Sequence, residues 1–174
     1  MARHALHGLC LAMVIIGLAS PSIAQHGAPD GEWPTYGGDL GHTRYSALGQ
    51  ITAENFNDLE LAWRFRTENL GPGPEFVFQS TPLMVDGVVY TTAGTRRAAV
   101  ALDAVTGEIL WLHRLNEGER AASAPRRLSG RGLTYWDDGP DGVIFYVTPG
   151  YRLIALNAQT GRRKSDFGEN GMID

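Results

Sequence analysis

The sequence predicts an all-β fold made of short antiparallel strands. Short runs rich in Val, Ile, Leu, Tyr and Thr recur along the chain, and glycine, proline or Asx residues separate them. The 174 residues include 22 glycines and 9 prolines, a composition typical of many tight turns. The apolar runs are too short and too often interrupted for helices. We therefore expect sheets whose strands are joined by tight turns.

One sequence unit occurs twice. Residues 86–94 are followed by residues 99–107, and the same order of patterns returns in residues 141–150 followed by residues 153–161. Each copy reads as a strand, a glycine turn, a second strand and an Asx-x-x-Thr-Gly turn. The Thr-Gly pairs of the two copies are 54 residues apart. A repeat of this size indicates a repeat architecture.

Each copy has the size of one blade of a β-propeller, which is four short antiparallel strands in about forty residues. In the first copy the strands are expected over residues 81–85, 88–92, 98–102 and 108–113. The predicted fold is thus a partial β-propeller of four-stranded antiparallel sheets. The first blade is expected at about residues 81–113 and the second at about residues 125–167.

The turn that ends each copy explains how the blades would dock. Asp103 can accept backbone N–H groups two residues further on, and Gly107 can take a positive φ where the strand reverses. Trp111 then falls on the outer strand, where its ring can pack between blades and its N–H can reach a backbone acceptor. In the second copy Ser165 stands where the tryptophan would be. That blade is expected to dock differently, with Phe167 as the candidate to fill the gap.

Residues 59–67 alternate between apolar and polar side chains as a strand does. A propeller must seal its ring, because an open strand edge promotes aggregation, and a strand from one terminus commonly completes the last blade. The segment around Trp63 is therefore predicted to be the closing strand.

Residues 1–24 are predicted to be an export signal. A short basic start leads into an apolar run over residues 9–19, and the small residues Ser22 and Ala24 follow. The apolar run is about half as long as a membrane span requires. We therefore expect cleavage after Ala24 and a periplasmic mature chain over residues 25–174, with an uncleaved membrane tether as the alternative.

Charge and cysteine content exclude some classes of partner. The chain has 15 basic and 19 acidic side chains and a formal net charge of −4. A mildly acidic surface argues against binding to nucleic acid and to anionic membranes. Cys10 is the only cysteine and lies within the predicted signal, so the mature chain is expected to have no disulfide.

Five motifs stand at residues 33–39, 55–63, 79–87, 101–111 and 129–136. Together they resemble those of the PQQ-dependent (quinoprotein) alcohol and glucose dehydrogenases. The resemblance implies an eight-bladed propeller that holds pyrroloquinoline quinone (PQQ) over its central channel with a Ca²⁺ beside it. It also implies oxidation of an alcohol or sugar, with ubiquinone or cytochrome c as electron acceptor.

The resemblance assigns two cofactor-binding residues. Arg131 matches an arginine that approaches the quinone oxygens in the family, where a fixed cation stabilises negative charge on reduction. Gln79 stands where relatives place a glutamate or glutamine that hydrogen-bonds the cofactor. The alternatives are a solvated arginine in a turn and an amide at a strand edge. Pro125 and Arg126 lie where alcohol-oxidising relatives have neighbouring cysteines, which favours the glucose or polyol branch.

The sequence offers neither a calcium site nor a catalytic aspartate. Calcium requires six to eight or so oxygen ligands gathered at one place. Asp137, Asp138 and Asp141 are close in sequence, but Gly139 and Pro140 between them favour a hairpin loop. The metal ligands and the catalytic aspartate are expected in later blades, so the predicted site has no metal and no catalytic residue. We therefore expect this chain to be an inactive fragment of the dehydrogenase.

A protein-binding scaffold is the rival interpretation. Periplasmic propellers of the outer-membrane assembly type share these repeats without being enzymes. Such a scaffold is expected to carry a cysteine directly after its signal, but Gln25 stands there. It would also have little use for Arg131.

Overall fold

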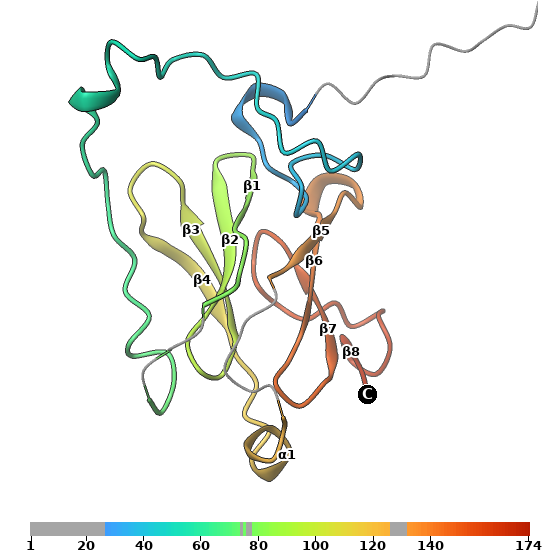
Figure 1. Ribbon diagram of the computed structural model, residues 1–174. Helices are drawn as coiled ribbons and strands as arrows, with labels where there is room; N and C mark the ends of the chain where they lie inside the picture. Colours follow the sequence, from blue (N-terminus) through green and yellow to red (C-terminus); the bar gives the residue numbers. More distant parts are fainter. Residues whose placement is uncertain (1–26, 74, 76–77, 126–131) are drawn as a thin grey trace, which may run out of the picture.

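The computed structural model describes residues 27–73, 75, 78–125 and 132–174, and it contains two four-stranded antiparallel sheets that pack side by side (Figure 1). The strand orders are β1-β2-β3-β4 and β5-β6-β7-β8, so within each sheet every strand pairs with the next strand in the chain. The all-β prediction is confirmed. Within the described part of the chain, no helix is long and apolar enough to cross a membrane.

The first sheet follows the predicted strands closely. Its strands are β1 (Leu83–Val85), β2 (Val88–Ala93), β3 (Ala98–Asp103) and β4 (Ile109–His113), which begin and end within two residues of the predicted positions. Asp86 and Gly87 form the turn between β1 and β2, with φ angles of 50° and 75°. Positive φ angles at both central positions favour the twist of a two-residue hairpin.

The second sheet has shorter outer strands. It consists of β5 (Thr134–Trp136), β6 (Val143–Val147), β7 (Leu153–Asn157) and β8 (Met172–Ile173). Four short helical segments complete the described structure: the 3-10 helices Pro29–Gly31, Phe56–Asp58 and Gly139–Asp141, and the α-helix α1 (Glu119–Ala122). The 3-10 turn Gly139–Asp141 lies between β5 and β6, as the loop prediction required.

The repeated turns have the expected chemistry. The Asp103 Oδ1 atom accepts hydrogen bonds from the N–H groups of Val105 and Thr106, at 3.0 and 2.7 Å. The backbone N–H of Thr106, and then its hydroxyl, hold the pKa of Asp103 below its usual value. In the second copy, Asn157 Oδ1 accepts the N–H and the hydroxyl of Thr160, both at 2.9 Å. The prediction for these turns is confirmed.

The outer strand of the second sheet differs from the prediction. The sheet was expected to end near residue 167, but β8 begins at Met172. Lys164 N donates to Ala155 O and Ala155 N donates to Gly171 O, both at 3.0 Å. Residues 165–170 therefore form a loop inserted into the strand that pairs with β7. A local pattern could not show the insertion, because the strand is defined by its partner β7.

Phe167, which lies in this loop, packs on the sheet to which it belongs. Its ring meets the ring of Phe145 edge-on, with 5.3 Å between centroids. Ile144 and Tyr146 point toward the first sheet, and alternate residues of a strand point to opposite faces. Phe167 therefore lies on the face of the second sheet that points away from the first.

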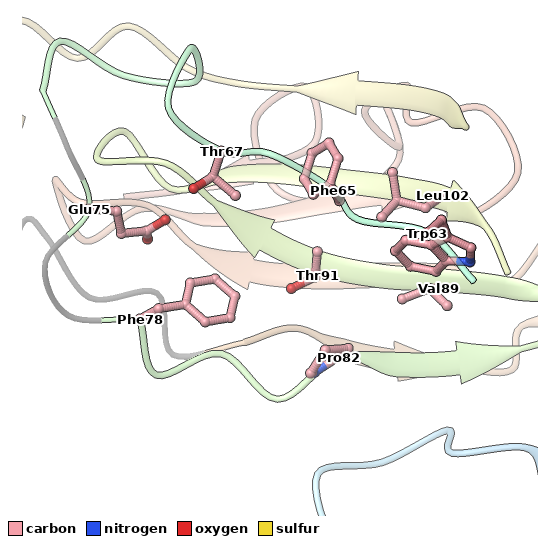
Figure 2. A pocket seen from close by; sticks show the side chains of 9 residues that line it. All are labelled: Trp63, Phe65, Thr67, Glu75, Phe78, Pro82, Val89, Thr91 and Leu102. Atoms are coloured by element: carbon pink, nitrogen blue, oxygen red, sulfur yellow. The ribbon is translucent and has the colours of Figure 1, made fainter. Parts of the chain in front are cut away.

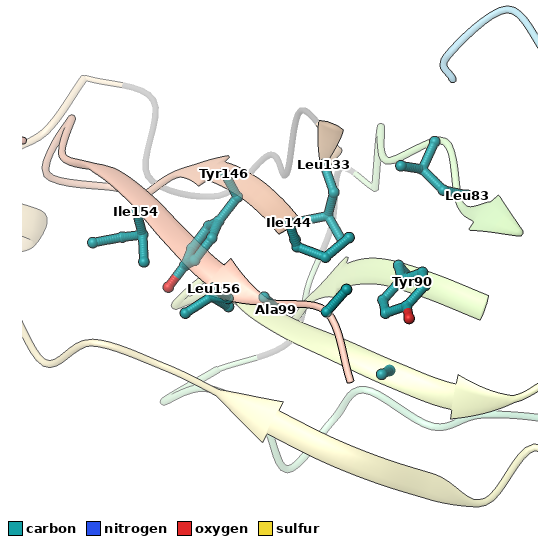
Figure 3. Packing of buried hydrophobic residues seen from close by; sticks show 10 residues of the cluster. Leu83, Tyr90, Ala99, Leu133, Ile144, Tyr146, Ile154 and Leu156 are labelled. Atoms are coloured by element: carbon teal, nitrogen blue, oxygen red, sulfur yellow. The ribbon is translucent and has the colours of Figure 1, made fainter. Parts of the chain in front are cut away.

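The hydrophobic core lies between the two sheets (Figure 3). Leu83, Tyr90 and Ala99 of the first sheet meet residues of the second sheet there. The second sheet contributes Ile144, Tyr146, Ile154 and Leu156. Burial of these side chains, at about 1.5–3 kcal/mol for each large one, is the main force that joins the sheets.

Trp111 docks the first sheet onto the second, as predicted. Its indole Nε1 donates a hydrogen bond of 2.7 Å to the carbonyl oxygen of Ala158. The ring lies against Gly161, where a Cβ atom would be 2.6 Å from it. Only glycine leaves room for the ring at this position.

Trp63 makes the same contact with the first sheet. Its Nε1 donates to the carbonyl oxygen of Ala104 at 3.0 Å, and its ring lies against Gly107, where a Cβ would be 2.6 Å away. Trp63 and Phe65 pack on the face of the first sheet that points away from the second, against Val100 and Leu102. The segment thus takes the place that the outer strand of a preceding blade would have.

Residues 59–67 are nevertheless not a strand, which corrects that part of the prediction. No strand is assigned between Leu59 and Thr67, although alternate side chains face the sheet. A strand requires a neighbouring backbone at hydrogen-bond distance, and among the described residues the segment crosses a sheet face and meets no sheet edge. Its role in closing a ring stays a prediction.

Residues 27–46 cover the free edge of β1. Trp33 and Met84 exchange backbone hydrogen bonds of 2.8 and 3.0 Å. The Asp39 carboxylate accepts the N–H and the hydroxyl of Thr43, both at 2.9 Å, which stabilises the loop behind Trp33. Covering an edge in this way removes a site for unwanted strand pairing.

Replacing Trp111 by Phe is expected to lower the free energy of unfolding by about 1–3 kcal/mol, because the hydrogen bond to Ala158 and part of the ring contact are lost. Urea unfolding followed by far-ultraviolet circular dichroism measures this change. Trp136→Phe is the matched control, since Trp136 is 54% exposed. Its effect should stay within about 0.5 kcal/mol. Equal effects of the two substitutions would contradict the docking role.

Candidate cofactor-binding site

The candidate site lies where the chain enters the two sheets. Residues 78–82 lead into β1, and Gly132 and Leu133 lead into β5. Residues 78–82 therefore lie at the end of the first sheet opposite the Asp86-Gly87 turn, and Gly132 and Leu133 lie at the end of β5 opposite the turn Gly139–Asp141.

The structure brings Gly132 close to the segment that follows Gln79. A Cβ atom on Gly132 would lie 3.5 Å from the carbonyl oxygen of Thr81 and 3.8 Å from Ser80 Oγ. Gln79 precedes Ser80 and is described. Arg131, the other predicted cofactor-binding residue, lies outside the described residues, as does Arg126.

Gln79 is exposed, and its amide has no hydrogen-bond partner among the described residues. The amide of Gln79 can therefore donate to a ligand without breaking an existing contact. This agrees with the expected role but does not test it, and both assignments stay predictions.

Hydroxyl groups hold the Gln79 segment against the sheet. Ser80 Oγ lies 3.2 Å from Thr91 Oγ1 and accepts the N–H of Thr92 at 3.4 Å. Thr91 Oγ1 donates to the carbonyl oxygen of Thr92 at 3.2 Å. The Thr92 hydroxyl is buried and has no hydrogen-bond partner among the described residues. A buried polar group of this kind costs stability unless a further group satisfies it.

A cavity of about 380 Å³ lies beside these hydroxyls, between the first sheet and the segment that carries Trp63 (Figure 2). Thr91, Phe78 and Leu102 are among its lining residues. At its rim, Glu75 Oε2 accepts the N–H of Gly94 at 3.0 Å. The side chain of Phe78, the residue before Gln79, therefore lines this cavity.

Two buried charged side chains fix the second sheet at this end. Arg97 Nη1 donates to the carbonyl oxygens of Val147 and Thr148, at 3.0 and 3.2 Å. The buried Glu117 carboxylate accepts the Thr148 hydroxyl at 2.9 Å and the Gly150 N–H at 2.8 Å. Sequence reasoning missed Arg97 and Glu117, because their partners are 31 to 51 residues away and no local pattern marks them.

His113 adds a hydrogen bond between the sheets. Its Nδ1 lies 2.8 Å from the hydroxyl oxygen of Tyr146, and the side chain is half-buried. Burial, and then the charge of Arg163, lower the pKa of His113, so the imidazole is neutral at pH 7.

The described residues suit a quinone cofactor better than a metal. PQQ is a flat anion with quinone oxygens and carboxylates, and such a group requires a cation and hydrogen-bond donors. The site combines the free amide of Gln79, the unsatisfied hydroxyl of Thr92 and the segment that follows Arg131. In the part of the chain that the structure describes, no three His, Cys, Asp or Glu side chains gather to hold a metal ion.

Two four-stranded antiparallel sheets, docked by a tryptophan and packed through their faces, define consecutive blades of a β-propeller. Residues 33–174 match the family described as "Glucose/ethanol/alcohol dehydrogenase, beta-propeller domain". The chain therefore belongs to the family of PQQ-dependent quinoprotein dehydrogenases, which confirms the resemblance and the propeller fold.

Similar proteins include dehydrogenases for alcohols and for glucose. The quinone-dependent alcohol dehydrogenase subunit of Gluconobacter oxydans is 36% identical over 80% of this chain and 17% of its own length. The quinoprotein glucose dehydrogenase A of Acinetobacter calcoaceticus is 29% identical over 85% of this chain and 21% of its own length. The chain thus spans about a fifth of the length of these relatives.

Solved structures agree with the fold. A europium-containing methanol dehydrogenase has a TM-score of 0.63 and 30% identity, over 75% of this chain and 22% of its own. The quinohemoprotein alcohol dehydrogenase from Comamonas testosteroni has a TM-score of 0.60 and 34% identity, over 75% of this chain and 18% of its own.

Substituting Gly132 by Ala is expected to weaken PQQ binding, because Gly132 has a φ of 89° and lies against Ser80 and Thr81, next to the predicted cofactor-binding residue Gln79. The strain of a left-handed alanine is about 1–2 kcal/mol, so the chain must shift or lose stability. Gly87→Ala is the matched control, with a φ of 75° and no atom within 4 Å of its Cβ. It should cost similar stability without a change in PQQ affinity. Fluorescence titration and urea unfolding of both variants measure the two effects.

Proposed function

We propose that this chain forms part of the PQQ site of a dehydrogenase that oxidises an alcohol or sugar and passes electrons to ubiquinone or a cytochrome c. The observation that carries the proposal is the contact of Gly132 with Ser80 and Thr81. Gln79 is next to Ser80 and Arg131 is next to Gly132 in the sequence, so this contact supports a site to which both segments contribute. Whole-enzyme activity is proposed by analogy with relatives that are about five times longer.

Each residue of the site has a separate part in this proposal. Arg131 places a fixed positive charge near the quinone oxygens and stabilises negative charge there. Gln79 donates its amide hydrogen to the cofactor and orients it. Bound PQQ supplies the carbonyl group that accepts a hydride from the substrate.

The chain by itself is proposed not to oxidise substrate. The resemblance assigns the Ca²⁺ ligands and the proton-accepting aspartate to other blades, and residues 27–73, 75, 78–125 and 132–174 contain no acidic cluster suited to a metal. The contribution of this chain is then to bind and orient the cofactor.

The class of substrate is proposed only as alcohol or sugar. The absence of a cysteine pair near Pro125 favours the glucose or polyol branch. The identities point the other way, with 36% to the alcohol dehydrogenase of Gluconobacter oxydans and 29% to the glucose dehydrogenase of Acinetobacter calcoaceticus. The proposal therefore includes both classes.

Export to the periplasm is a further proposal. It is supported by the basic start, the apolar run and the small residues before Gln25. The predicted signal, residues 1–24, lies outside the described residues. Chain recovered from a periplasmic extract should begin at Gln25 on N-terminal sequencing, and a chain that keeps Met1 would contradict cleavage.

Titration of the purified chain with PQQ, with and without Ca²⁺, tests the proposed function. Arg131→Ala should weaken binding by about tenfold or more, since a hydrogen bond to a charged group is lost, and Gln79→Ala should weaken it less. Arg66→Ala is the control, because Arg66 is exposed and, among the described residues, forms an ion pair with Glu68 alone.

Two outcomes would contradict different parts of the proposal. Absence of PQQ binding, or equal binding by the Arg131 and Arg66 variants, would favour the scaffold interpretation. Reduction of a redox dye with ethanol or glucose by this chain would overturn only the proposal that it is inactive by itself.

A further inference from the structure

A second cavity lies between the two sheets at the end opposite the candidate cofactor site. Its volume is about 280 Å³, and its walls include Tyr90, Trp111 and Tyr135. Asp86, in the turn after β1, and Asp141, in the turn before β6, also line it. The proposed function does not use this cavity.

Tyr90 is the buried polar group of the cavity. Its side chain is 4% exposed, and its ring lies 5.9 Å from that of Trp111 and 6.3 Å from that of Tyr135 (Figure 3 shows Tyr90 among its apolar neighbours). Its hydroxyl has no hydrogen-bond partner in the described part of the chain. Burial, aided by Tyr135 and Asp86, raises the pKa of Tyr90 to about 12, so the hydroxyl is neutral. The hydroxyl faces the cavity, where it is open to a hydrogen bond with a ligand that enters.

The electrostatic character of the cavity is negative. Asp86 and Asp141 are exposed and form no ion pair with any described residue, whereas the neighbouring Asp138 pairs with Lys164 at 3.5 Å. No lysine or arginine is among the lining residues. Acidic charges, with those of Asp137 and Asp86 first, add to burial in raising the pKa of Tyr135.

We propose that this cavity binds a small alkylammonium group. The ammonium would donate hydrogen bonds to the Tyr90 hydroxyl and to the carboxylates of Asp86 and Asp141, which lie at the two turns. The aromatic rings attract a cation through their negative faces, and Trp111 and Leu110 provide an apolar surface for the alkyl chain. The same chemistry is present in a free primary amine and in the lysine side chain of a protein.

The experiment titrates the full chain with n-propylammonium chloride and follows the indole N–H signals by ¹H–¹⁵N NMR. Trp111 lines the cavity and should shift with a saturable dependence on concentration. Trp63 is an internal control, because it makes the same kind of hydrogen bond to Ala104 but does not line this cavity. Propionamide, a neutral molecule of similar size, should leave both signals unchanged, and sodium chloride controls for ionic strength.

Two variants test the residues. Tyr90→Phe keeps the ring and removes the hydroxyl, and Asp86→Asn changes an exposed side chain that does not endanger folding. Each should weaken binding by about tenfold, the loss expected for a hydrogen bond to a charged group. Asp30→Asn is the control, because Asp30 is exposed and is not in the cavity. Equal affinity in all three variants, or equal shifts with sodium chloride, would overturn the proposal.

A blocked tripeptide with a central lysine, and its Nε-acetylated form, distinguish the two sources of the cation. Tighter binding of the lysine peptide than of n-propylammonium would identify a protein side chain as the ligand. Weaker binding of the peptide would identify a free amine. Equal binding of the lysine and acetyl-lysine peptides, together with no response to n-propylammonium, would overturn the site.

Discussion

The position of one indole ring controls the relation between the two sheets. Trp111 reaches from the outer strand of the first sheet to the last turn of the second, where it hydrogen-bonds Ala158 and covers Gly161. The contact requires a glycine, because any Cβ would occupy the space of the ring. Trp63 repeats it one blade earlier on Gly107. Both tryptophans therefore pack on the glycine of an Asx-x-x-Thr-Gly turn, so this contact belongs to the repeated unit.

This docking has consequences at the cofactor end. Ser80 belongs to the segment before the first sheet and Gly132 to the segment before the second, so their contact exists only when the sheets are correctly placed. Arg97 and Glu117 add buried polar contacts to the hairpin between β6 and β7. Such groups stabilise only when fully paired, which makes the arrangement specific. A site built between blades is thus fixed by the same forces that stack the blades.

The two ends of the sheets have different chemical characters. The hydroxyls of Ser80, Thr91 and Thr92 and the amide of Gln79 lie where the chain enters the first sheet, which is the end proposed to bind an anionic quinone. Aromatic rings and carboxylates gather at the opposite turns, around Tyr90 and Asp86, which suits a cation. Two ligands of opposite charge could therefore bind the same pair of blades without competing. Membership of the quinoprotein dehydrogenase family accounts for the first of these ends only.

The sequence by itself determined the strands of the first sheet and the Asx-x-x-Thr-Gly turns, because each depends on nearby residues. The docking of Trp111 followed from its place in the repeat, although its partner Ala158 is 47 residues away. It also placed Gln79 and Arg131 on two separate segments. Only the tertiary structure decided that residues 59–67 cross a sheet face and that the second sheet ends in β8 after an inserted loop. It also decided the hydrogen bonds of Arg97 and Glu117 to the second sheet and the position of Tyr90 in a cavity between the sheets. The partners of Trp63, Arg97 and Glu117 are 31 to 51 residues away, and β8 meets its partner β7 only across the inserted loop. A local pattern carries no information about such partners.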